Sequence, residues 1–153
     1  MQNTKIDNRP TGKLPVVRLR PALPDRLLEA AALLLVVASW VYVICNYGSG
    51  EAAFGTMLAA ASSITVTVAA LALAARMPSN MYNFPVRVTA ANIAMQYMMA
   101  VRMVRVMNVV VGFMGLAIVI ACVHRWAMVL VYVSLGLMAA VLVAYFVLAC
   151  RRK

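Results

Sequence analysis

Groups that carry out acid–base or metal chemistry are scarce in this sequence. Its 153 residues contain only four Asp and Glu side chains, one histidine and three cysteines. A catalytic site needs a positioned acid, base, nucleophile or set of metal ligands. The carboxylates are scattered along the chain, and no metal-ligand spacing surrounds His124. We therefore expect a non-enzymatic protein without a metal ion or a cofactor.

The three cysteines leave one question open. Cys45 and Cys122 each fall near the same end of a long apolar run, so a disulfide between them is conceivable in an oxidising compartment. Cysteine also behaves as a small apolar residue in packed helices. Cys150 falls at the opposite end and is expected to stay reduced.

Apolar side chains are abundant, at 65% of the residues against 12% that are charged. A soluble fold of this length would expose far more apolar surface than it could bury. Four apolar runs each approach the roughly 20 residues that an α-helix needs to cross a hydrocarbon core of about 30 Å. The sequence predicts an all-α polytopic membrane protein whose four transmembrane helices form two antiparallel hairpins, at about residues 27–47, 54–75, 90–123 and 127–149.

Positive charge is distributed unevenly about these runs. Of the 14 Lys and Arg residues, only Arg125 falls in one of the two short turns. Basic residues beside membrane helices are retained on the cytoplasmic side. Both termini are therefore predicted to be cytoplasmic. The net charge of +10 is explained by anionic lipid headgroups as partners rather than by nucleic acid.

The first 26 residues are predicted to form a flexible, basic cytoplasmic tail ahead of a transmembrane domain at residues 27–153. Four prolines interrupt any helix there, and the composition is too polar for a packed core.

Small residues recur at a spacing of four in the second and fourth runs, and they let helix backbones approach closely within a bilayer. We expect them to pack the bundle, with the second run at its centre. Homodimerisation through one of these ridges is the alternative. Asn108, inside the third run, is expected to have a packing or partner-binding role. The predicted packing residues are Gly55, Ala59, Ser63, Asn108, Gly112, Gly136 and Ala140.

The connection between the second and third runs is the most distinctive segment. The residue before Pro85 prefers an extended backbone, and Thr89 is a suitable N-cap for a helix that begins at Ala90 and continues into the third run. Its first turns would project into the cytoplasmic interface. We expect a partner protein or lipid headgroups to be contacted there by Asn92, Met95, Gln96, Met99, Arg102 and Arg105.

Methionines repeat every four residues along the same helix, at Met95, Met99, Met103 and Met107. A row of thioethers can bind Cu(I), but methionine also fills apolar contacts and forms adaptable docking surfaces. Because no histidine or cysteine lies nearby in the sequence, packing and docking are favoured over a metal site.

Residues 83–92, followed by Gln96-Tyr97 and by Arg102 and Arg105, resemble the stretch N-[YF]-P-V-x-[IV]-T-x-x-N-x-x-x-Q-Y in bacterial membrane proteins of the domain of unknown function 1648 class. The match covers mainly residues 83–105, and the loop at residues 48–53 is too short for the outer-loop motif of that class. Some relatives are similar to immunity and signalling proteins, so the resemblance implies an accessory or immunity role in a bacterial inner membrane.

These features together predict a non-enzymatic integral membrane protein. It would act as an accessory, immunity or signalling component and dock a partner through its cytoplasmic segment at residues 80–105. The alternative is a small oligomeric transporter or channel in which Glu29, in the first turn of the first run, couples ion movement.

Overall fold

The structure, a computed structural model, describes residues 5–7, 16–18, 21–48, 50–84, 89 and 92–151. Its long helices are α1 (Leu23–Cys45), α2 (Glu51–Ala74), α3 (Ile93–Ala121) and α4 (Met128–Arg151). Two short 3-10 helices, η1 (Ser79–Met81) and η2 (Arg125–Ala127), lie in the connections. Strand β1 (Lys5–Asp7) pairs antiparallel with β2 (Val16–Arg18). The predicted all-α architecture of four long apolar helices is confirmed.

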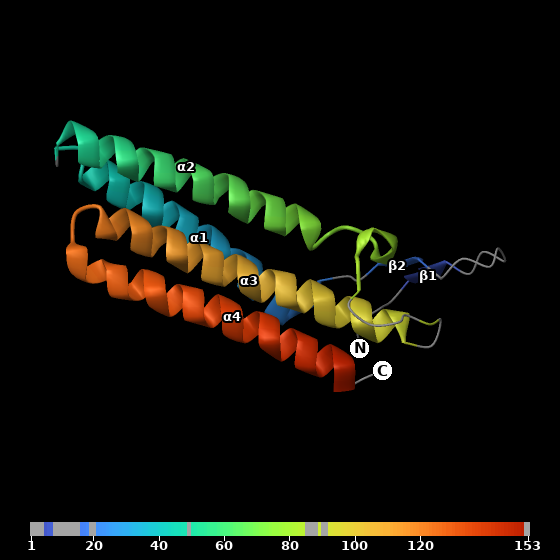
Figure 1. Ribbon diagram of the computed structural model, residues 1–153. Helices are drawn as coiled ribbons and strands as arrows, with labels where there is room; N and C mark the ends of the chain where they lie inside the picture. Colours follow the sequence, from blue (N-terminus) through green and yellow to red (C-terminus); the bar gives the residue numbers. More distant parts are fainter. Residues whose placement is uncertain are drawn as a thin grey trace.

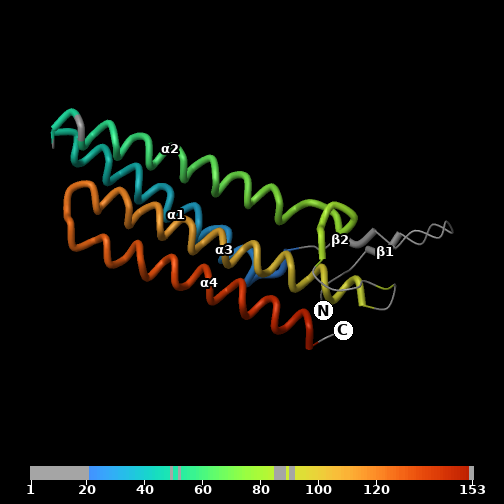
Figure 2. The backbone as a smooth tube through the Cα atoms, viewed as in Figure 1, coloured from blue at the N-terminus to red at the C-terminus, as the bar shows by residue number. Residues whose placement is uncertain are grey.

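The four long helices lie side by side in an elongated bundle (Figure 1). Short turns join α1 to α2 and α3 to α4 at one end, which we call the turn end (Figure 2). The other end, where α1 and α3 begin and where α2 and α4 finish, is called the terminal end.

α3 is the central helix, because it contacts α1, α2 and α4. Two glycines allow its backbone to approach its neighbours closely. A Cβ atom at Gly112 would lie 3.3 Å from Cβ of Leu35 in α1, and one at Gly115 would lie 2.5 Å from Cγ2 of Ile64 in α2. Small residues have this role where lipid supplies no hydrophobic drive between helices.

Buried apolar side chains form three clusters along the bundle. The cluster at the terminal end includes Ala75, Ile93, Tyr97 and Val101; the middle cluster includes Ala32, Val36, Ile64, Val68 and Val111; and the cluster at the turn end includes Val43, Met57, Ala61 and Val119. One polar contact adds to them, since Nε1 of Trp40 donates a hydrogen bond of 2.9 Å to Oγ1 of Thr65, joining α1 to α2.

The starts of α1 and α2 follow from local sequence. Pro24 lies in the first turn of α1, where its missing N–H group would have no helical partner in any case. Oδ2 of Asp25 accepts a hydrogen bond of 2.9 Å from the backbone N–H of Ala22. α2 starts after Gly50, whose φ of 103° is a backbone conformation that favours glycine.

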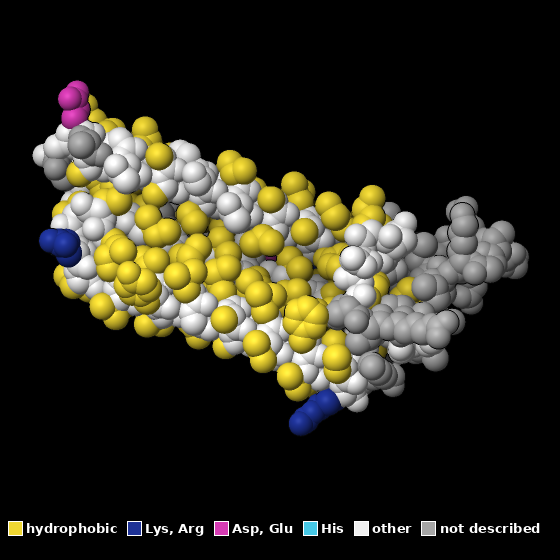
Figure 3. Space-filling view, in the orientation of Figure 1, with side chains coloured by type: hydrophobic (Ala, Val, Ile, Leu, Met, Phe, Trp, Pro, Cys, Tyr) yellow, Lys and Arg dark blue, Asp and Glu magenta, His cyan; other side chains and the backbone are white. Residues whose placement is uncertain are grey.

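Large apolar side chains remain exposed over the length of the bundle. Leu34, Val66 and Val129 are 68%, 69% and 63% exposed. Figure 3 shows such side chains covering the visible face, with charged side chains only near its ends. Soluble proteins rarely expose apolar patches of this extent, and all four helices are long and apolar enough to cross a membrane. The chain is therefore a multi-pass membrane protein.

One helix boundary differs from the prediction. α1 begins at Leu23, so residues 23–26 belong to the helix and not to the tail. For α3, which the structure describes from Ile93, the predicted start at Ala90 lies outside the described residues, as does much of the predicted tail. Oδ1 of Asn92 accepts a hydrogen bond of 2.8 Å from the N–H of Thr89, and the N–H of Ile93 donates one of 3.0 Å to the carbonyl of Thr89. These bonds are typical of a capped helix start.

The small residues of α2 and α4 do not pack the bundle as predicted. Those that lie on exposed faces are Gly55, Ala59 and Ser63 in α2, and Gly136 and Ala140 in α4. A Cβ atom at Gly55 or Gly136 would have no neighbouring atom within 4 Å. A spacing of four identifies a face that permits close approach, but not the helix that covers it. Within this chain, α3 rather than α2 supplies the closely packed glycines and occupies the centre.

Candidate functional site

Arg105 lies at the centre of a group of charged side chains near the terminal end, which we call the ion-pair cluster. Its Nη1 is 2.9 Å from Oδ1 of Asp25, and its Nε donates a hydrogen bond of 3.2 Å to Oε1 of Glu29. Nη2 of Arg76 lies 3.5 Å from Oε2 of Glu29. The cluster connects the start of α1 and α3 with Arg76, which lies in the connection just after α2.

Burial makes the members of this cluster unequal. Asp25 and Glu29 are four residues apart and so share one face of α1. The side chains of Asp25 and Arg105 are only 3% and 4% exposed, whereas that of Arg76 is 67% exposed. A buried charge is costly unless it is paired, but an exposed ion pair contributes little. Asp25 and Arg105 therefore depend on each other, and Arg76 is peripheral.

Two tyrosines fix the connection between α2 and α3 against the start of α3. The hydroxyl of Tyr82 donates a hydrogen bond of 2.7 Å to the carbonyl of Ala74, and that of Tyr97 donates one of 2.5 Å to the carbonyl of Met77. The two rings pack edge to face with their centroids 5.3 Å apart. The pKa of Tyr82 is raised to about 12, mainly because the hydroxyl group is buried and secondly because Tyr97 lies beside it. Tyr82 therefore remains a hydrogen-bond donor at neutral pH.

We call this connection, residues 75–84, together with the start of α3 at residues 92–98, the terminal cap. Its apolar cluster joins Ala75 to Ile93 and Tyr97. Three methionines of the cap nevertheless remain accessible: Met77, Met81 and Met95 are 43%, 66% and 40% exposed. The cap thus combines a fixed backbone with flexible apolar side chains of the kind that adapt to a binding partner.

Of the six residues predicted to contact a partner or lipid, two are buried in contacts within the bundle. Gln96 is 0% exposed, and its Nε2 donates a hydrogen bond of 3.3 Å to the carbonyl of Ala149 in α4. Arg105 belongs to the ion-pair cluster and does not face the surface as predicted. The remaining four are accessible, either exposed or half-buried: Asn92, Met95, Met99 and Arg102.

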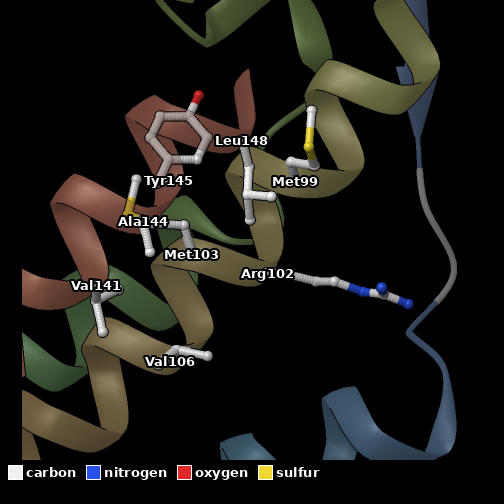
Figure 4. A pocket seen from close by; sticks show the side chains of 8 residues that line it. All are labelled: Met99, Arg102, Met103, Val106, Val141, Ala144, Tyr145 and Leu148. Carbon is white, nitrogen blue, oxygen red and sulfur yellow. The ribbon is translucent and has the colours of Figure 1, made fainter. Parts of the chain in front are cut away.

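Met99 and Arg102 line a hollow of about 410 Å³ between α3 and α4, which we call the α3–α4 groove (Figure 4). Its other lining residues are Met103, Val106, Val141, Ala144, Tyr145 and Leu148. All of these side chains are apolar except the guanidinium group of Arg102 and the hydroxyl group of Tyr145.

The remaining predicted residues lie apart from these contacts. Asn108 is 3% exposed, and its Oδ1 accepts no hydrogen bond within the described part of the chain. It therefore lies inside the bundle, without a surface for a partner. Cys45, Cys122 and Cys150 are all free thiols. Across the residues that the structure describes, no group of three or more His, Cys, Asp and Glu side chains could hold a metal ion.

The sequence carried a signal for the ion-pair cluster that the residue-by-residue reasoning missed. Asp25 and Glu29 are one helical turn apart at the start of an apolar run, and Arg105 lies within another. Charges at such positions must find partners at the same depth. The contacts of Tyr82 carried no such signal, because they depend on the path that the connection follows in space.

Comparison with protein-family models, with curated proteins and with solved structures finds no match to this chain. The fold and the site define its class: a four-helix, multi-pass membrane protein with a buried ion-pair cluster and a packed cap at the terminal end.

Proposed function

We propose that this is a non-enzymatic protein of a bacterial inner membrane that docks a membrane-protein partner through its terminal cap, as an accessory, immunity or signalling component. The excess of Lys and Arg beside the terminal end supports a cytoplasmic position for the cap and both termini. The resemblance of residues 83–105 to the domain of unknown function 1648 class favours the same role. Residues 85–88, 90 and 91 of that stretch lie outside the described residues.

The observation that carries this proposal is the contrast between the backbone of the cap and its surface. The hydrogen bonds of Tyr82 and Tyr97 hold the connection in place, so little backbone entropy would be lost on binding. Met81 and Met95 remain exposed and offer polarizable side chains to a partner.

The ionisable groups favour binding over catalysis. Asp25, Glu29 and Arg105 pair with one another and contribute to the packing of α1 against α3. His124 lies in the turn before η2, at the opposite end of the bundle. A catalytic role would require such groups to converge on an accessible substrate position.

Affinity capture from native membranes tests the proposal. Replacing Met81 and Met95 together by alanine should weaken capture of the partner about thirtyfold, since each partly exposed methionine can bury apolar area worth about 1 kcal/mol. The matched control is Met128→Ala, because Met128 is 44% exposed but lies at the turn end. Equal capture by the double variant and by the control would reject the cap as the docking surface.

One observation favours the alternative, a small oligomeric transporter or channel. Four charged side chains converge at one end of helices that can cross a membrane, and such groups often mark ion pathways. Glu29 would then be the ion-coupling residue, although both its carboxylate oxygens face arginines. Ion flux into liposomes that Glu29→Gln abolishes would support this function, and unchanged flux in the variant would reject the role of Glu29.

A further inference from the structure

We propose that the partner of the terminal cap carries an acidic side chain, Asp or Glu, that pairs with Arg102. This inference rests on the proposed function, because it names the chemistry of the partner at the same docking surface. It adds one contact of defined charge to the apolar contacts of Met81 and Met95.

Arg102 continues the exposed surface of the terminal cap along α3. Met95, Met99 and Arg102 recur at spacings of four and three, which places them on one face of the helix. Met95 and Arg102 are exposed, and Met99 is half-buried. The seven residue steps from Met95 to Arg102 span about 10 Å along the helix axis. A partner with an interface of ordinary size, about 800 Å² on each side, that covers Met95 therefore also reaches Arg102.

The charge of Arg102 has no counterpart within the described part of the chain. Arg76 and Arg105 contact carboxylates of α1, but Arg102 forms no ion pair or hydrogen bond with any described residue. In Figure 4 its guanidinium group extends away from α4 and from the hydroxyl of Tyr145. The charged group is therefore presented at the surface of α3 and not to the α3–α4 groove.

The terminal end has an excess of positive charge. Its described charged side chains are five arginines and two carboxylates, namely Arg26, Arg76, Arg102, Arg105 and Arg151 with Asp25 and Glu29. Both carboxylates already face arginines. Glu51, the other carboxylate whose side chain is described, lies at the turn end. A second copy of the chain in the same orientation therefore offers Arg102 no free carboxylate from its described side chains, and charge complementarity favours a different protein.

The neighbours of Arg102 favour a protein over lipid headgroups. Exposed faces elsewhere on the bundle carry branched apolar side chains such as Leu34, Val66 and Val129. Arg102 instead shares its face with two methionines, whose thioethers adapt to the shape of a protein surface. A guanidinium group binds a carboxylate through two parallel N–H donors, which gives the contact a defined geometry.

Carbodiimide cross-linking in native membranes tests this pair. A carbodiimide activates a carboxylate, which then forms an amide bond with a primary amine in direct contact while the reagent becomes a urea. Arg102→Lys keeps the positive charge and supplies the amine. We expect one amide between position 102 and an Asp or Glu of one foreign protein, located by mass spectrometry of the linked peptides. Arg102→Gln should lower capture of that protein about fivefold, as expected for an exposed ion pair.

The matched controls are Arg151→Lys and Arg151→Gln, because Arg151 is an exposed arginine at the end of α4. We expect no amide at position 151 and unchanged capture. The absence of an amide at position 102 would overturn the proposal, and this is the result for an arginine that contacts only phosphate groups of phosphatidylglycerol or phosphatidylethanolamine. Links from position 102 only to a carboxylate of this chain would also overturn it.

Failure of this inference can be distinguished from failure of the docking proposal. If the cap docks a partner without the proposed pair, replacing Met81 and Met95 lowers capture while position 102 forms no amide. If the cap does not dock a partner, the methionine variant captures as much as the Met128→Ala control.

Discussion

Replacing Arg105 by glutamine tests whether the ion-pair cluster holds the bundle together. Glutamine keeps a polar side chain but removes the charge, so the carboxylate of Asp25 stays buried without its partner at 2.9 Å. Glu29 retains its contact with Arg76, which is exposed. We therefore expect a large loss of stability that comes mainly from Asp25.

The magnitude follows from the two contacts of Arg105, at 2.9 Å to Asp25 and at 3.2 Å to Glu29. Removing one member of a buried ion pair costs about 3–5 kcal/mol. Glu29 is 21% exposed, so water partly screens its contact. The expected loss in the free energy of unfolding is therefore near the lower limit, about 3 kcal/mol. Arg76→Gln, which removes a contact of 3.5 Å at a side chain 67% exposed, should cost less than about 1 kcal/mol.

The assay is unfolding of the protein in mixed micelles by increasing fractions of a denaturing detergent, followed by the fluorescence of Trp40 and Trp126 and by helical circular dichroism. The double variant Asp25→Asn with Arg105→Gln should lose less stability than the sum of the two single variants, because no buried charge is left unpaired. A loss in Arg105→Gln no greater than that in Arg76→Gln would refute the assignment of Arg105 as the central charge.

Three further predictions follow from contacts elsewhere. Gly115→Ala should destabilise the bundle by about 1–3 kcal/mol in the same assay, because its Cβ would meet a side chain at 2.5 Å, whereas Gly136→Ala should be close to neutral. The pKa of Tyr82 is raised from 10.0 to about 12, so its contribution to stability is complete below pH 10 and is lost as the pH rises through about 12, which tyrosinate absorbance during unfolding can follow. In the proposed orientation, an impermeant maleimide added to intact cells should label the exposed thiol of Cys45 but not that of Cys150.

The four helices could be predicted from the sequence because each apolar run is long enough to cross a bilayer as a helix, and a helix satisfies its backbone hydrogen bonds within its own segment. The capping contacts of α3 follow from local sequence in the same way. The side chain of Asn92, three residues after Thr89, accepts a hydrogen bond from the N–H of Thr89, and the N–H of Ile93 donates to the carbonyl of Thr89. The predicted start at Ala90 stays a prediction, because that residue lies outside the described residues.

The candidate site was only partly predictable for a different reason. Arg102 and Arg105 are three residues apart and look equivalent in the sequence, yet one is exposed and the other is 4% exposed. The rotation of α3 within the bundle decides between them, and that rotation follows from the close approach of Gly112 to α1. The spacing of small residues at Gly55 also predicted close helix packing. A Cβ atom at Gly55, however, would have no neighbouring atom within 4 Å.

The most direct test of the docking proposal is photo-cross-linking in native membranes, with the reactive side chain placed at Met81 of the terminal cap and, as a control, at Val129 near the turn end. The two positions have similar exposure, 66% and 63%, at opposite ends of the bundle. The proposal predicts that position 81 links to one foreign protein in stoichiometric amount and that position 129 does not. Cross-links from position 81 only to lipid or to further copies of the chain would contradict it.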